Sequence, residues 1–66
     1  MWLAEVKLNL GTKVKIKELG MDGVIRGRST SNSGRIVYEI ELEGIAWIGG
    51  LATSVLHYMR EELNVG

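Results

Sequence analysis

Hydrophobic and polar residues alternate along much of the chain, which is the pattern of β-strands that bury one face. In residues 13–17, Val14 and Ile16 alternate with three lysines. The stretch 35–43 is the clearest case, because four large apolar residues fall on one face and three glutamates on the other. The same reasoning predicts further strands over residues 4–10, 24–28 and 45–48.

Glycines and a polar stretch divide these strands. Asp-Gly at 22–23 is a strong turn signal, and Gly27 within a short strand predicts a bulge or bend. Gly44 and the Gly-Gly pair at 49–50 predict two more turns. Residues 29–34 are small and polar and predict a loop between two antiparallel strands.

The segment 51–63 fits two structures. Ser54 is a suitable cap for a helix that places Val55, Met59 and Leu63 on one face. Alternatively, residues 53–58 form a strand and residues 59–62 a single 3-10 turn. Periodicity does not decide between them.

Length and composition narrow the classes of protein. Sixty-six residues make one domain, residues 1–66, with a small core. There is no cysteine and only one histidine, His57, so no disulfide, metal site, cofactor or catalytic residue is predicted. A monomer of this size would be marginally stable, and the hydrophobic content of 45% is high enough for a well-packed core or for self-association, so we expect a homo-oligomer. No apolar run approaches a membrane span and no signal-peptide pattern is present, so a cytoplasmic protein without membrane contact is expected.

Charge is balanced overall but unevenly distributed. Residues 1–36 carry seven basic and three acidic side chains, and residues 37–66 carry one basic and five acidic. The asymmetry fits a basic face for DNA or RNA, salt bridges between strands, or head-to-tail pairing of subunits. The residues that would form the nucleic-acid-binding face are Lys13, Lys15, Lys17, Arg26, Arg28 and Arg35.

Several short motifs together resemble the SH3-like barrels, which include KOW and Tudor-type modules and are common in phages and plasmids. They are the Gly-x-x-Gly of 20–23, Val-Ile-x-Gly of 24–27, Tyr-Glu-Ile-Glu of 38–41 and Arg-Glu-Glu-Leu of 60–63. The resemblance spans residues 11–65. It implies an all-β fold: a small SH3-like barrel of five to six antiparallel strands with a short 3-10 turn near the C-terminus. On that analogy, the strand and 3-10 turn are preferred for residues 53–63.

A more distant similarity is to the plasmid-borne type II dihydrofolate reductases, which are SH3-like barrels with a Val-Gln-Ile-Tyr pore motif. Val55 and Tyr58 match that motif, and Leu63 follows at a similar spacing. Leu56 replaces the glutamine and His57 the isoleucine, which removes the amide that contacts ligand in that family. A reductase is therefore the weakest functional alternative, and a non-enzymatic protein is expected.

The aromatic residues point to a binding surface. SH3-like barrels often bind peptides or nucleic acid through an aromatic-lined groove. Trp47 is the predicted protein-binding anchor, together with Ile48, Leu51 and Tyr58, although it also fits a core position. Trp2 is a candidate for a subunit interface.

The sequence thus predicts a protein-binding accessory or regulatory factor of a phage or other mobile element. A nucleic-acid-binding module is the alternative.

Overall fold

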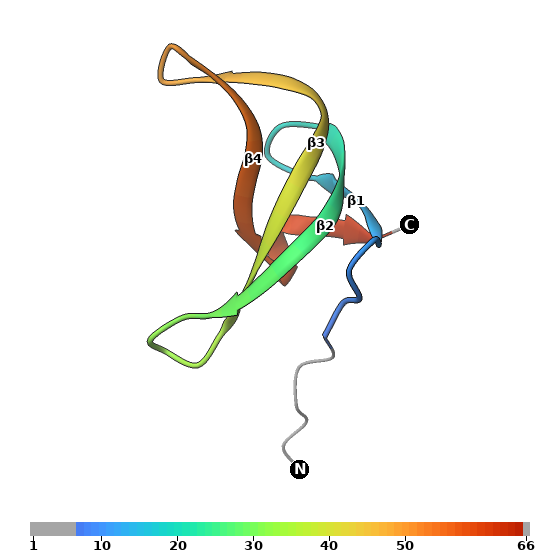
Figure 1. The fold of residues 1–66 in the computed structure, drawn as a ribbon, viewed down its shortest axis with the longest axis vertical. Coiled ribbons are helices and arrows are strands. Elements are labelled where there is room, and N and C mark those ends of the chain that lie inside the picture. The colour runs from blue at the N-terminus through green and yellow to red at the C-terminus, as the bar shows by residue number, and fades with distance from the viewer. Residues whose placement is uncertain (1–6, 66) are drawn as a thin grey trace.

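A computed structural model describes residues 7–65. They form a single sheet of five antiparallel strands in the order β4-β3-β2-β1-β5 (Figure 1). The elements are β1 (Lys13–Ile16), β2 (Met21–Thr30), β3 (Ile36–Ile48), β4 (Leu51–Met59), the 3-10 turn η1 (Arg60–Glu62) and β5 (Leu63–Val65). The all-β class, the antiparallel pairing and the 3-10 turn near the C-terminus are therefore as predicted. Residues 51–63 form strand and 3-10 turn rather than helix.

The sheet does not close into the predicted barrel. β4 and β5 are its two edges, and no ladder joins them within residues 7–65. The strand expected over residues 4–10 does not supply closure, because Lys7–Asn9 have no regular structure and Leu10 begins a turn. Residues 4–6 of that expected strand, and Trp2, lie outside the described residues.

The core lies on one face of the sheet. Its buried residues are Val14, Ile16, Ile25, Tyr38, Ile40, Leu42, Ala46 and Leu63. β3 supplies four of these residues at alternate positions, as expected for a strand with one buried face. β5 pairs with β1, and this pairing places Leu63 opposite Ile16.

The first turn is displaced from its predicted position. The chain reverses at residues 17–20, where Gly20 has a φ of +67° and donates its N–H to the carbonyl of Ile16 at 2.7 Å. Asp22 and Gly23 lie inside β2 instead. Gly23 is required for packing rather than for a turn, because a Cβ on it would come within 2.6 Å of the Ile40 side chain.

The bulge predicted at Gly27 is present. Ile25 pairs with Ile40 and Gly27 with Glu39, so Arg26 is the extra residue of β2. Such a bulge bends the strand and redirects the side chain of the extra residue.

A second irregularity replaces the turn predicted at Gly44. β3 continues through this residue to Ile48, but the four residues 42–45 face only Ser54 of β4. Beyond it, Gly49 and Gly50 connect the strands with φ values of +59° and +81°. Positive φ at both central residues is the requirement of a two-residue type I′ hairpin turn, so the turn predicted here is confirmed.

Replacing Gly23 with alanine should destabilise the sheet. The added Cβ would meet the Ile40 side chain at 2.6 Å and the Glu41 carbonyl oxygen at 2.9 Å, which forces β2 and β3 apart. We expect the free energy of unfolding in urea to fall by about 1–3 kcal/mol. Gly44→Ala is the matched control, since its nearest neighbour would be Met21 Cε at 3.9 Å. Equal losses in the two variants would contradict this packing.

Candidate functional site: an exposed apolar hairpin

The distal end of the β3–β4 hairpin carries a cluster of exposed apolar side chains. Ile45, Trp47, Ile48 and Leu51 are 63%, 75%, 39% and 70% exposed. These four residues are called the apolar tip. The hairpin extends from the body of the sheet at one end of the long axis (Figure 1, top). The tip is therefore a projecting surface that can enter a groove of another molecule.

The local sequence explains how the apolar tip forms. The Gly-Gly turn holds the strands in register, so that Ile48 faces Leu51 and Trp47 faces Ala52. No charged residue occurs from Gly44 to Leu56. Successive side chains of a strand alternate between faces, so Ile45 and Trp47 share one face of the tip and Ile48 and Leu51 the other. Four large exposed apolar side chains at one hairpin end are a candidate interaction surface.

Three of the four residues predicted to bind protein lie together. Trp47, Ile48 and Leu51 are in the apolar tip, and Trp47 is not a core residue. Tyr58 lies near the opposite end of β4, where it faces Tyr38 and packs against the core. Burial, with the negative charges of Glu18 and Glu62, raises the pKa of Tyr58 above 10.0, so its phenol is protonated at neutral pH.

Sequence reasoning missed Ile45 as a member of the tip. The sequence pattern places this residue in a short strand, 45–48, and predicts no role for it. Its position between Gly44 and Trp47 in an uncharged stretch was the available signal.

The lysines of the predicted basic face are partly neutralised. Lys13 Nζ lies 3.6 Å from a carboxylate oxygen of Glu43, and Lys15 Nζ lies 4.0 Å from Asp22. Both pairs are exposed to solvent and contribute little to stability. Lys17 makes no ion pair with any residue in the 7–65 range.

The bulged arginine of β2 joins a cluster of opposite charges. Arg26 Nε lies 2.8 Å from Glu39, and its Nη1 lies 3.7 Å from Glu41. His57 on the neighbouring strand places Nε2 3.3 Å from the other oxygen of Glu39. The two glutamates on β3 are thus occupied by a neighbouring cation, which is the cross-strand pairing that the charge pattern allowed.

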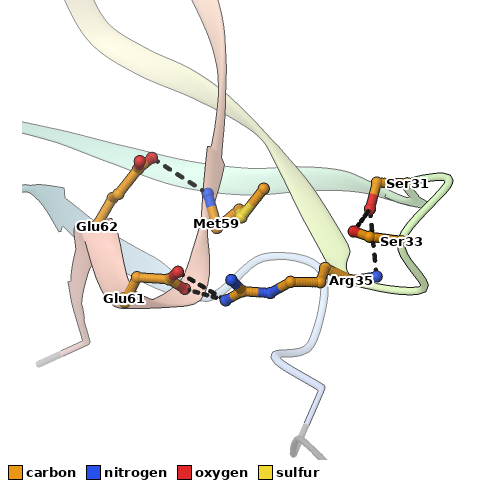
Figure 2. Close-up of polar contacts among 6 residues, drawn as sticks. All are labelled: Ser31, Ser33, Arg35, Met59, Glu61 and Glu62. Atoms are coloured by element: carbon orange, nitrogen blue, oxygen red, sulfur yellow. Dashed lines mark hydrogen bonds and ion pairs between the residues drawn. The ribbon is translucent and has the colours of Figure 1, made fainter.

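The remaining two arginines support the far end of the sheet. Arg35 Nη2 donates to both carboxylate oxygens of Glu61, at 2.6 and 2.7 Å, and so ties the start of β3 to η1 (Figure 2). Arg28 donates to the backbone carbonyl of Leu8 at 3.1 Å. Four of the six predicted basic residues are therefore paired with carboxylates and a fifth holds the backbone.

The polar hairpin end beside Arg35 is held by its own hydroxyl groups. Ser31 Oγ and Ser33 Oγ lie 2.9 Å apart, and the backbone N–H of Arg35 donates to Ser31 Oγ at 3.2 Å (Figure 2). These contacts occupy the hydroxyls locally. The segment is a structured loop, and it begins at Ser31 rather than Ser29 because β2 extends to Thr30.

The segment that partly matches the reductase pore motif does not form a pore-like surface. Residues 55–58, which match the reductase pore motif in part, alternate along the edge strand β4. Leu56 and Tyr58 pack against the core, whereas His57 lies beside Glu39, so the motif does not line a single surface. Two open hollows of about 340 and 380 Å³ lie over the Lys15–Asp22 ion pair and beside Glu41 and Glu43.

Residues 7–65 show neither a metal-binding cluster nor a helix long enough to span a membrane. No group of three or more His, Asp or Glu residues is placed to hold a metal ion. The only helical element of this part of the chain, η1, is three residues long and far too short to cross a bilayer.

Comparison with known proteins returns no relative. No known protein family, no curated protein sequence and no solved structure matches the chain. The site must therefore be interpreted from its own geometry.

The Arg35–Glu61 contact should make stability depend on pH. A hydrogen bond from its own backbone and then the Arg35 guanidinium lower the pKa of Glu61 below 4.5. Because the folded state then binds this proton less tightly than the unfolded state, the stabilisation is complete above about pH 4.5 and is lost as pH falls through the folded pKa. Urea unfolding at a series of pH values should show a larger loss of stability at low pH in the wild type than in Glu61→Gln, which keeps the other ion-paired carboxylates.

Arg35→Gln is the control for the cause of that shift. It removes the side-chain partner and leaves the backbone hydrogen bond, so part of the pH dependence should remain. Identical pH profiles for the wild type and Glu61→Gln would contradict the assignment.

The neutralised basic face predicts weak nucleic-acid binding. Fluorescence anisotropy with labelled duplex DNA and single-stranded RNA at low salt should give a Kd no tighter than about 10⁻⁴ M, the weak end of non-specific binding. Tighter binding that falls steeply with salt and is lost in Lys17→Gln would show that the face is a functional one.

Proposed function

We propose that this chain is a non-enzymatic protein-binding module whose apolar tip inserts into an apolar groove of a partner protein. The carrying observation is the exposure of Trp47, at 75%, at the end of a projecting hairpin where residues 44–56 include no charged residue. Tryptophan is the residue most often found at the energetic centre of protein interfaces.

The free energy available from burying the Trp47 side chain favours a role in binding. A tryptophan side chain buries about 150–250 Å² when fully covered. At about 25 cal/mol per Å² of apolar surface, covering Trp47 would contribute roughly 4 kcal/mol before the costs of association. Burial of the neighbouring Ile45 and Leu51 side chains would add to this favourable free energy. No comparable gain is available from the solvated ion pairs on the outer face of the sheet.

The same proposal includes the resemblance of this chain to SH3-like proteins, which the arrangement of its strands supports. β5 returns to pair with β1 after a 3-10 turn, and the sheet bends at the Gly27 bulge and at residues 42–45. The origin in a phage or plasmid and the cytoplasmic location come from the sequence resemblance and composition alone. The nucleic-acid alternative is less favoured, because Lys13, Lys15, Arg26 and Arg35 already have carboxylate partners.

Replacing Trp47 with alanine should abolish partner capture without unfolding the protein. The side chain is exposed, so the free energy of unfolding should change by less than about 0.5 kcal/mol. Affinity capture from host lysate, with quantitative mass spectrometry, should lose its specific partner in Trp47→Ala. Leu10→Ala is the matched control, since Leu10 is an exposed apolar residue outside the tip. Capture that is equal in wild type and Trp47→Ala would refute the proposal.

A further inference from the structure

β4 is an unusually unprotected edge of the sheet. It is nine residues long, and within residues 7–65 it pairs only with β3. Proteins normally protect such edges with lysine, proline, bulges or very short strands. The other edge, β5, has only three residues. β4 contains no Lys, Arg, Asp, Glu or Pro, and His57 is its only titratable group apart from the protonated Tyr58.

We propose that β4 pairs antiparallel with β4 of a second copy of this chain, about a twofold axis at Val55. A twofold axis perpendicular to the sheet keeps each face of the two sheets on the same side. Residues that face each other in an antiparallel pair point to the same face of the sheet. The axis must therefore pass midway between the two copies of one residue, which face each other across it. Val55 is the central residue of Leu51–Met59, and only this register pairs the whole strand.

The side chains of β4 are complementary to themselves in this register. Leu51 lies opposite Met59 of the second copy, and Ala52 lies opposite Tyr58 of the second copy. A small residue thus faces a large one, and the half-exposed apolar side chains along the edge cover each other. Val55 faces its own counterpart on the axis.

Charge does not oppose this association. On β3, Glu41 lies opposite Val55 and Glu39 opposite His57, and at the end of β4 Glu62 accepts a hydrogen bond from the Met59 N–H at 3.3 Å. In the dimer the two copies of Glu41 are separated by three strand spacings, or about 14 Å, which exceeds the Debye length of about 8 Å at physiological salt. The two uncharged edges therefore meet without repulsion. A foreign strand would gain the same backbone hydrogen bonds but not this matching of side chains, which favours a second copy.

The dimer would also give Tyr58 a place beside the apolar tip. Trp47 faces Ala52 within one copy, and Ala52 would face Tyr58 of the second copy. The three residues would then lie in one row across three neighbouring strands. This consequence rests on the proposed function, whereas the dimer itself does not.

A single engineered thiol tests the axis directly, because the chain contains no cysteine. In Val55→Cys, the two thiols would be directly opposite, with a Cα separation of about 4.5–5.5 Å that suits a disulfide. Under mild oxidation we expect a covalent dimer at a rate at least about tenfold above that of Ser29→Cys, a control on the inner strand β2. Equal rates in the two variants would overturn the proposal.

Sedimentation equilibrium on the full chain tests the association without a thiol. The wild type should dimerise, and Ser54→Lys should raise the dimer Kd by at least about tenfold through repulsion across the axis. Ser29→Lys adds the same charge to an exposed serine on β2 and should dimerise as the wild type does. A monomeric wild type, or equal Kd values in the two lysine variants, would overturn the proposal.

Sedimentation equilibrium and affinity capture together separate the dimer from the proposed function. Trp47 lies outside the β4–β4 ladder, so Trp47→Ala should dimerise normally while losing its partner. If the dimer is absent but capture still requires Trp47, only the dimer is wrong. If the dimer forms but capture does not require Trp47, only the proposed function is wrong.

Discussion

The structure depends on the buried face of β3. This strand contributes Tyr38, Ile40, Leu42 and Ala46 to a core of only eight buried residues, and it lies between β2 and β4. Tyr38 also accepts a hydrogen bond at 3.0 Å from the backbone N–H of Leu8, which fixes the incoming chain to the core. In so small a domain, each of these residues is a large part of the total stability.

The alternation that makes β3 recognisable also made most of the fold predictable. The strands around Val14, Ile25 and Tyr38, the bulge at Gly27 and the Gly-Gly hairpin turn follow from period-two patterning and glycine conformation. The prediction of a turn at Asp22–Gly23 was wrong. The glycine there allows β3 to pack closely against β2, and no local sequence pattern reveals such a contact. Closure into a barrel likewise depends on contacts between distant edges.

The candidate site was predictable in part for the same reason. Trp47, Ile48 and Leu51 adjoin one turn, so local sequence was enough to group them. Tyr58 follows the same strand, but β4 carries it away from the tip and against Tyr38. The role of the basic residues could not be predicted from local sequence. Their partners Glu39 and Glu61 come from other elements, and only the folded register shows that the charges are used within the chain.

The central claim is that Trp47 is exposed in the free protein and buried in a complex. The most direct measurement is tryptophan fluorescence of the Trp2→Phe variant, in which Trp47 is the sole tryptophan. The account predicts a solvent-exposed emission maximum and efficient acrylamide quenching for the free protein. In the purified complex with the captured partner, the emission should shift to the blue and the quenching should fall. A complex in which Trp47 emission and quenching are unchanged would contradict the account.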